Sequence, residues 1–226
     1  MSTPLGVVVL ISGRGSNLQA IIDATRAEKL PIELRAVISN EPGAEGLKRA
    51  QSAHIPTHVV CHRDFESRTE FDRALMQKID ACHPQLVVLA GFLRILGKNF
   101  IDHYTGRLIN IHPSLLPDFP GLRTHARAFE SGVPYHGTSV HFVTNEVDTG
   151  PIVIQAKVKV LASDTPDSLA ARVLEEEHRI YPLAIRWFAE GRLTLEGNRV
   201  LVDGKVRVEQ GLIAQESSPD GDDSSP

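Results

Sequence analysis

The sequence has little cysteine, no long hydrophobic run and no excess of positive charge, and each shortage excludes a class of protein. Two cysteines, Cys61 and Cys82, among 226 residues cannot build the disulfide framework of a small secreted domain. The first four residues lack the charged start of a signal peptide, and the apolar run Leu5–Ile11 is far too short to cross a bilayer. We therefore expect a cytosolic protein without a membrane partner.

The net charge of −4 is concentrated at the end of the chain. Residues 215–226 hold four acidic side chains and no Lys or Arg, so the rest of the chain is formally neutral. A neutral body lacks the broad basic surface that nucleic-acid binding needs, and we expect no nucleic-acid partner. We expect residues 1–212 to form one domain and residues 213–226 to form an acidic, disordered tail.

Short apolar runs alternate with helical patterns over the first half of the chain. Such alternation is typical of parallel strands joined by right-handed helical crossovers. The expected strands are residues 5–11, 32–39, 57–60, 85–90 and 108–110. One expected helix begins near Leu18, and three others span residues 43–53, 64–82 and 98–104.

The pattern changes after Pro113. Residues 117–132 are expected to form a loop, and residues 136–143 and 152–160 two antiparallel strands. A last long helix is predicted with Thr165 as its cap and an end at Gly191, followed by a hairpin over residues 193–208. The predicted fold is a single-domain, Rossmann-like α/β fold, with a mostly parallel twisted sheet flanked by helices and antiparallel strands in the C-terminal half.

A glycine loop, residues 12–17, joins the first strand to its helix. The backbone N–H groups of Gly15, Ser16 and Asn17 lie at a helix N-terminus, which favours a bound phosphate. Leu18 replaces the third glycine of a dinucleotide fingerprint, so a phosphomonoester is favoured over NAD. A tight turn in which Ser16 only caps the helix is the alternative.

Asn110 and His112 stand two residues apart at the end of an apolar run. In an extended strand they point to the same face, and Pro113 and Pro117 then direct the chain into a loop. The carboxyl end of a strand is where an open α/β sheet places its chemistry. Two solvated polar residues at a strand end are the alternative hypothesis.

Asp148 lies in a loop between two expected strands, where it is either a turn residue or a partner for an imidazole. A nearby carboxylate favours the protonated form of a histidine. Metal binding is not expected, because the remaining candidate ligands are scattered and form no paired C-x-x-C. These candidates are His54, His58, Cys61, His62, Cys82 and His83.

Together these motifs resemble the phosphoribosylglycinamide formyltransferases, the folate-dependent family of purine synthesis. The Asn-x-His-Pro-Ser-Leu-Leu-Pro motif is similar to that of the wider formyltransferase superfamily. The glycine loop and Glu177–His178 restrict the resemblance to the phosphoribosylglycinamide formyltransferases within it. The resemblance runs in order over roughly residues 5–212. Its segments are Ile11–Asn17, Leu89–Leu96, Asn110–Pro117, His136–Val143, Asp148–Pro151 and Glu177–Pro182.

The resemblance implies transfer of a formyl group from 10-formyltetrahydrofolate to the amine of N1-(5-phospho-D-ribosyl)glycinamide, a step toward IMP. The family's catalytic trio falls on Asn110, His112 and Asp148. Asn110 and protonated His112 would stabilise the oxyanion that forms when the amine attacks the formyl carbon. Asp148 would keep His112 charged and position a water that moves the proton from the amine to N10.

The resemblance also implies two binding sites, no metal and no covalent intermediate. Its glycinamide ribonucleotide site falls on Gly15, Ser16, Asn17, Leu174, Glu175, Glu176 and Glu177. Its 10-formyltetrahydrofolate site falls on Arg68, Leu93, Arg94, Ile95, Leu96, Asn110, Thr144, Asn145, Glu146, Val147 and Asp148. Arg14 is assigned no role, and the implied assembly is a monomer or a homodimer.

Three alternatives remain open. Methionyl-tRNA formyltransferase and formyltetrahydrofolate deformylase are similar around Asn110 and His112, but they carry an RNA-binding and a regulatory domain respectively, and this sequence shows neither. A neutral body also disfavours a tRNA substrate. A non-catalytic phosphosugar- or folate-binding sensor would not need Asn110, His112 and Asp148 together.

Overall fold

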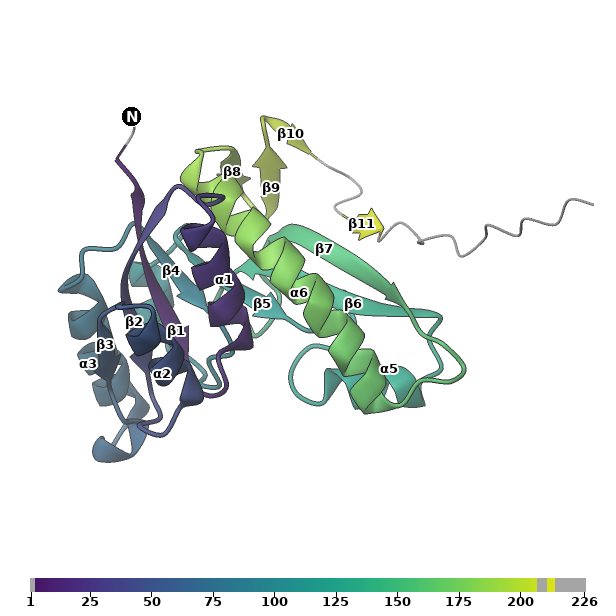
Figure 1. Ribbon diagram of the computed structural model, residues 1–226, viewed down its shortest axis with the longest axis horizontal. Helices are drawn as coiled ribbons and strands as arrows, with labels where there is room; N and C mark the ends of the chain where they lie inside the picture. The colour runs from purple at the N-terminus through teal and green to yellow at the C-terminus, as the bar shows by residue number, and fades with distance from the viewer. Residues whose placement is uncertain (1–2, 207–210, 214–226) are drawn as a thin grey trace, which may run out of the picture.

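An eight-stranded sheet forms the centre of the protein, and helices cover both of its faces (Figure 1). The computed structural model describes residues 3–206 and 211–213. The strands of this sheet are β1 (Leu5–Ile11), β2 (Ile32–Ser39), β3 (Thr57–Val59), β4 (Leu86–Leu89), β5 (Leu108–His112), β6 (Tyr135–Phe142), β7 (Ile152–Lys159) and β11 (Gly211–Ile213). The helices are α1 (Ser16–Arg26), α2 (Glu45–Ser52), α3 (Arg68–Asp80), α4 (Lys98–His103), α5 (Thr124–Glu130) and α6 (Pro166–Ala189), with a short 3-10 turn η1 (His62–Asp64).

The strand order is β11-β7-β6-β5-β4-β1-β2-β3. Strands β3, β2, β1, β4 and β5 run parallel to one another, whereas β6 is antiparallel to both β5 and β7. The prediction of a Rossmann-like, mostly parallel sheet with antiparallel strands in the C-terminal half is confirmed. The pairing of β6 with β5 was not anticipated, and it becomes important at the site.

Alternating side chains of the parallel strands belong to two separate hydrophobic cores, one on each face of the sheet. Val7, Val9 and Ile11 of β1 pack with α1, α2 and α6, whereas Val8 and Leu10 pack with α3 and α4. All five side chains are fully buried. This arrangement gives three layers, with both faces of the sheet covered, as parallel sheets require.

Two sequence predictions about helices were wrong. Helix α3 begins at Arg68 and not at residue 64, because the Ser67 side chain accepts from the Glu70 N–H and so caps the helix there. The predicted loop of residues 117–132 contains the helix α5. The cap of α6 is confirmed, since Thr165 and Ser168 form a reciprocal capping box.

A small antiparallel sheet of β8 (Leu193–Glu196), β9 (Arg199–Val202) and β10 (Lys205–Val206) follows α6. The chain turns at Asp203–Gly204 between β9 and β10, and it makes three strands where a hairpin was expected. Strand β11 then adds to the main sheet beside β7. Most of the predicted tail, residues 214–226, lies outside the described residues.

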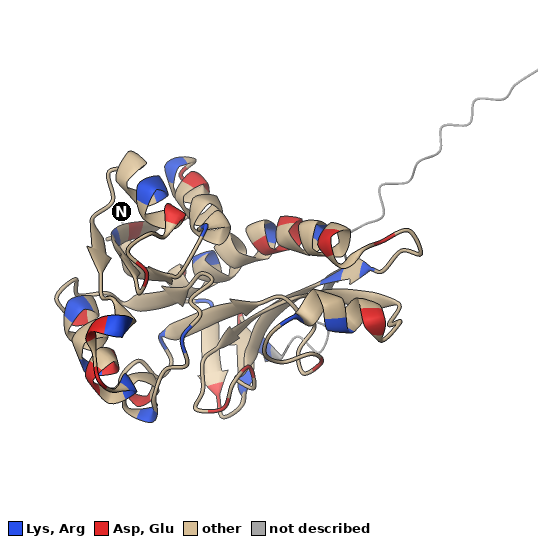
Figure 2. Cartoon of the chain, turned by 90° about the horizontal axis from the view of Figure 1, so that it is seen from below, with Lys and Arg blue, Asp and Glu red and all other residues tan. Residues whose placement is uncertain are grey.

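The surface charges are of both signs. Figure 2 shows Lys and Arg interspersed with Asp and Glu along the covering helices. Cys61 and Cys82 are free thiols. Among the helices of residues 3–206 and 211–213, none is both long and apolar enough to cross a membrane.

Candidate active site

The predicted site residues gather at the carboxyl ends of β1, β4 and β5. Strand order reverses between β1 and β4, since the chain builds β2 and β3 on one side of β1 and then places β4 on the other. Such a switch point leaves a crevice where open α/β sheets bind ligands. Two hydrogen bonds bridge it, because Ser12 N–H donates to Gly91 O at 3.0 Å and Leu93 N–H donates to Ser12 Oγ at 2.7 Å.

Asn110 and His112 lie on the same side of β5, as predicted, and His112 is the last residue of the strand. Thr138 Oγ1 and Ser114 N–H both donate to the backbone carbonyl of His112, at 3.0 and 2.9 Å. These bonds fix the backbone at the point where Pro113 turns the chain out of the sheet. His112 is 6% exposed, so solvation does not explain the pair.

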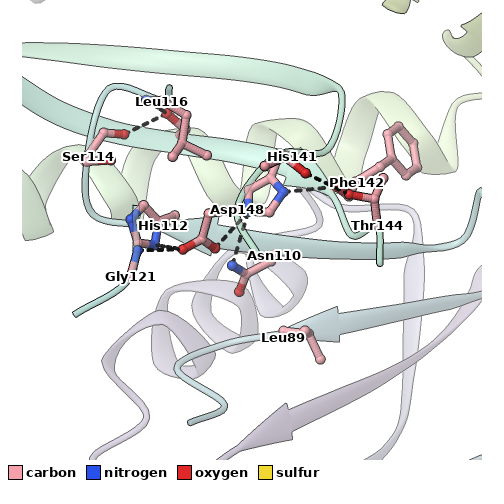
Figure 3. A network of polar contacts seen from close by, with 12 residues as sticks. Leu89, Asn110, His112, Ser114, Leu116, Gly121, His141, Phe142, Thr144 and Asp148 are labelled. Atoms are coloured by element: carbon pink, nitrogen blue, oxygen red, sulfur yellow. Dashed lines mark hydrogen bonds and ion pairs between the residues drawn. The ribbon is translucent and has the colours of Figure 1, made fainter. Parts of the chain in front are cut away.

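Asp148 reaches this pair from the loop between β6 and β7 (Figure 3). Its Oδ2 lies 3.3 Å from His112 Nδ1 and accepts from Gly121 N–H at 2.9 Å. Asp148 has a left-handed backbone, with φ of 55°, which aspartate tolerates better than most residues. Asp148 is therefore more than a turn residue, since its half-buried carboxylate faces the imidazole of His112.

His112 has an oxygen acceptor at each ring nitrogen. Nδ1 faces the Asp148 carboxylate, and Nε2 lies 3.1 Å from Phe119 O. A neutral imidazole donates only once, whereas an imidazolium donates from both nitrogens. A ring that donates from both nitrogens would satisfy both acceptors.

His141 is part of the same cluster, although it was not among the predicted site residues. It stands opposite Asn110 in the antiparallel β5–β6 pair, and its Nε2 lies 3.2 Å from Asn110 Nδ2 and 3.7 Å from Asp148 Oδ1. Its Nδ1–H donates to Phe142 O at 2.9 Å. Pairing residues 136–143 with residues 108–112 would have found it, because residues opposite each other in a sheet are neighbours.

Burial lowers the pKa of His141, which keeps the ring neutral. A neutral ring that donates from Nδ1 must accept at Nε2, so the Asn110 side chain turns its NH₂ group toward His141. The second hydrogen of that NH₂ remains for another acceptor. His141 thereby sets the orientation of the Asn110 amide.

The glycine loop is built by close backbone contact. Gly15 has a φ of 71°, and a Cβ there would lie 2.7 Å from the Cα of Gly46 in α2. Gly46 N–H donates to Gly13 O at 3.0 Å, and Arg49 Nε donates to Arg14 O at 2.8 Å. Within the described residues no side chain caps α1, so the alternative role of Ser16 as a cap does not hold.

The structure brings Glu177 of α6 to this loop. Asn17 Nδ2 donates to Glu177 Oε2 at 2.6 Å, and both residues are buried. Burial raises the pKa of Glu177, while the bond from Asn17 opposes that shift. Asn17 Oδ1 is also buried and has no partner in the described part of the chain. An unpaired buried acceptor beside a carboxylate is a polar site open to a ligand.

The three residues of α6 that precede Glu177 differ in exposure and in their contacts. Leu174 is half-buried, whereas Glu175 is exposed and Glu176 pairs with Arg179. Of the predicted segment 174–177, Glu177 alone hydrogen-bonds to the glycine loop within the part of the chain that the structure describes.

The residues predicted for folate surround the other side of the crevice. Leu93 and Ile95 are 72% and 65% exposed in the segment after β4, and Val147 is 53% exposed in the loop that carries Asp148. Arg68 and Arg94 are exposed cations next to this segment. Leu96 is buried in the core and anchors the segment.

The remaining loop residues predicted for folate make local contacts. Thr144 Oγ1 donates to Glu146 O at 3.3 Å, and Asn145 Nδ2 donates to Asp102 Oδ1 at 3.4 Å. No cluster of three or more His, Cys, Asp or Glu in residues 3–206 and 211–213 is arranged to hold a metal ion.

The chain is similar to known proteins in sequence and in fold. A family model described as formyl transferase matches residues 5–185. A phosphoribosylglycinamide formyltransferase of Escherichia coli (strain K12) is 54% identical over 212 residues, which cover 94% of this chain and 100% of the relative. A trifunctional purine biosynthetic protein adenosine-3 of Drosophila melanogaster is 48% identical over 187 residues, or 82% of this chain and 14% of that protein.

A solved structure of phosphoribosylglycinamide formyltransferase from Coxiella burnetii superposes with a TM-score of 0.89 at 54% identity. The match covers 93% of this chain and 99% of that one. The shared fold, the identity over nearly the full length and the family model agree, and the chain belongs to the formyl transferase family.

Proposed function

We propose that this protein is a phosphoribosylglycinamide formyltransferase of purine biosynthesis. It transfers the formyl group of 10-formyltetrahydrofolate to the primary amine of N1-(5-phospho-D-ribosyl)glycinamide. The observation that carries the proposal is the His112–Asp148 pair beside Asn110, which one strand, β4, separates from the strand that leads into the glycine loop. An anion-binding loop and an oxyanion site at the same edge of the sheet suit a phosphorylated amine and an acyl-type donor.

The formyl donor supplies an activated carbonyl carbon, and Asn110, His112 and Asp148 act on the charge that develops on its oxygen. Asn110 donates the amide hydrogen that His141 does not take. Protonated His112 adds a positive charge, which Asp148 holds in place. His112 Nε2 now donates to Phe119 O, so the oxyanion replaces that carbonyl as its acceptor.

The glycine loop and Glu177 hold the phosphorylated substrate. Backbone N–H groups of Gly15, Ser16 and Asn17 stand at the N-terminus of α1, where the helix favours an anion. Glu177 accepts hydrogen bonds, and the free Oδ1 of Asn17 offers one more acceptor. These two groups suit the hydroxyls of a ribose, and the turn at Leu174–Glu176 borders them.

The segment Leu93–Leu96, Arg68 and the loop Thr144–Asp148 hold the folate. Exposed Leu93, Ile95 and Val147 offer apolar surface to a flat heterocycle. Arg68 offers a cation to a carboxylate. These residues fit a molecule with an apolar ring system at one end and anionic groups at the other.

The decisive experiment is a formyl-transfer assay with purified protein, 10-formyltetrahydrofolate and glycinamide ribonucleotide. We expect formation of tetrahydrofolate only when the ribonucleotide is present. Charged initiator tRNA serves as a rival acceptor, and a reaction without acceptor measures release of formate. Transfer to the tRNA, or formate release at the same rate without an acceptor, would contradict the proposal and support one of the related enzymes.

The proposed partners are these two small molecules, and the proposed location is the cytosol, where the free thiols of Cys61 and Cys82 stay reduced.

A further inference from the structure

The segment between β4 and α4 is held at both ends by side chains from elsewhere in the fold. Leu93 N–H donates to Ser12 Oγ at 2.7 Å, and Gly97 N–H donates to Asp72 Oδ2 at 2.8 Å. The structure describes residues 91–97 in full and places none of them in a helix or strand. Its path over the crevice therefore depends on these two hydrogen bonds and on the buried side chains of Phe92 and Leu96.

Asp72 is an unusual residue to find at the second end. It is 5% exposed on α3, and its Oδ1 is buried without a hydrogen-bond partner among the described residues. Burial raises the pKa of Asp72, and the Gly97 N–H, Arg68 and Arg94 oppose the rise in that order. A buried carboxylate with one unsatisfied oxygen costs folding free energy, so stability alone does not account for it.

Gly97 is shaped to receive this carboxylate. A Cβ at residue 97 would lie 2.8 Å from Asp72 Oδ2 and 3.7 Å from Arg68 Nε. The φ of Gly97 is −82°, which any residue adopts, so the close approach of Asp72 is the reason that a side chain does not fit. Arg68, Asp72 and Gly97 also line one groove of about 280 Å³.

Arg68 and Asp72 lie one helical turn apart on α3, so they share a face of that helix. The bond from Gly97 therefore ties the segment 93–96 to the same face that carries Arg68. These are two of the three parts to which the proposed function assigns the folate.

We propose that Asp72 is a positioning residue for the formyl donor, which holds the Gly97 end of the segment 93–96 at a fixed distance from Arg68. This inference rests on the proposed function and deepens its folate site. Asp72 lies apart from the Asn110–His112–Asp148 cluster, so its loss acts on donor binding and leaves the chemical step alone.

Asp80 on the same helix provides a matched control. Its carboxylate also joins α3 to α4, because Tyr104 OH donates to Asp80 Oδ1 at 2.9 Å and His103 Nε2 lies 3.0 Å from Asp80 Oδ2. These contacts lie at the far end of both helices and do not touch residues 93–97. Asp80→Ala therefore tests whether loosening the contact between α3 and α4 is enough to weaken binding of the formyl donor.

The experiment compares steady-state kinetics of Asp72→Ala and Asp80→Ala, with each substrate varied in turn. We expect Asp72→Ala to raise KM for 10-formyltetrahydrofolate about tenfold, the effect of losing one hydrogen bond to a charged group. Its kcat and its KM for glycinamide ribonucleotide should stay within about twofold, as should all constants of Asp80→Ala. Asp72→Asn should recover most of the folate affinity, because its amide oxygen still accepts from Gly97.

Gly97→Ala tests the same contact from the other side, and it carries the test alone if Asp72→Ala does not fold. We expect Gly97→Ala alone to raise the KM for 10-formyltetrahydrofolate as much as Asp72→Ala does. Added to Asp72→Ala, it should raise this KM by less than about a further twofold. The positioning role is overturned if the KM of Asp72→Ala for 10-formyltetrahydrofolate is normal. It is also overturned if Asp72→Ala and Asp80→Ala raise the KM values for both substrates equally. An inactive wild-type protein would instead reject the proposed function, so the two failures are distinguishable.

Discussion

The glycine loop and the catalytic cluster lie at the same edge of the sheet but are built in different ways. The glycine loop is fixed by backbone against backbone, with Gly15 and Gly46 too close for a side chain between them. The catalytic cluster is fixed by side chains, since Asp148, His112 and His141 join two strands and two loops through polar contacts. The first region should therefore be sensitive to added volume, and the second to lost hydrogen-bonding groups.

The difference fits the two tasks. A phosphate carries its charge before, during and after the reaction, so a rigid cradle of N–H groups serves it throughout. The oxygen of a formyl group gains its charge only in the transition state, so its donors must be oriented in advance and then exchange partners. Phe119 O on His112 Nε2 is such an exchangeable partner.

The largest effect should come from removing the charged donor. We expect His112→Ala to lower kcat for formyl transfer by on the order of 10²–10³, with the KM for glycinamide ribonucleotide nearly unchanged. Circular dichroism and thermal unfolding check that the variant is folded. A near-normal kcat would show that His112 takes no part in the mechanism. The contrast between the glycine loop and the catalytic cluster would then not hold.

The next effect should come from adding a methyl group to the glycine loop. Gly15→Ala forces a left-handed residue and a contact with Gly46, and it should lower the free energy of unfolding by about 2–4 kcal/mol. It should also raise the KM for glycinamide ribonucleotide while leaving the KM for folate in place. Denaturant unfolding and kinetics measure both.

Gly13→Ala is the control for this variant, because a Cβ at residue 13 meets no described atom within 4 Å and Gly13 is not among the described residues with a positive φ. Equal stability losses in both variants would show that the loop is not fixed by its contact with α2.

The contrast also explains how far the sequence could predict the site. Runs of buried residues such as Leu5–Ile11 and Leu86–Leu89 predicted the parallel sheet, and the Gly13–Asn17 loop predicted a turn at a helix N-terminus, because these are local patterns. Thr165 predicted the start of α6 for the same reason.

Contacts between distant segments were harder to predict. His141 joins the cluster through the register of β6 on β5, and Asp72 meets Gly97 through the packing of α3 beside α4. No local periodicity of the sequence indicates either contact, although His141 lies within the segment His136–Val143 that contributes to the family resemblance. The helix α5 was missed because its seven residues follow two prolines and lack a capping side chain among the described residues.

A smaller effect should come from the residue that orients Asn110. His141→Phe removes the acceptor that holds the Asn110 NH₂ group while keeping a planar aromatic ring, and we expect kcat to fall about tenfold. His141→Asn should restore part of the loss if its side-chain oxygen reaches the same NH₂ group. An unchanged kcat in His141→Phe would show that β5 alone orients Asn110.

The smallest effect concerns the stability of the glycine-loop region. Burial raises the folded-state pKa of Glu177 above its unfolded value, so its favourable contribution is full below the unfolded pKa and is lost as pH rises through the folded pKa. Glu177→Gln has no such loss and keeps an oxygen for Asn17 Nδ2. Its Tm should exceed that of the wild type by roughly 2–4 °C at pH 8, and the difference should vanish near pH 4. A Tm difference that does not change with pH would mean that Glu177 titrates alike in both states, and that the bond from Asn17 fully offsets its burial.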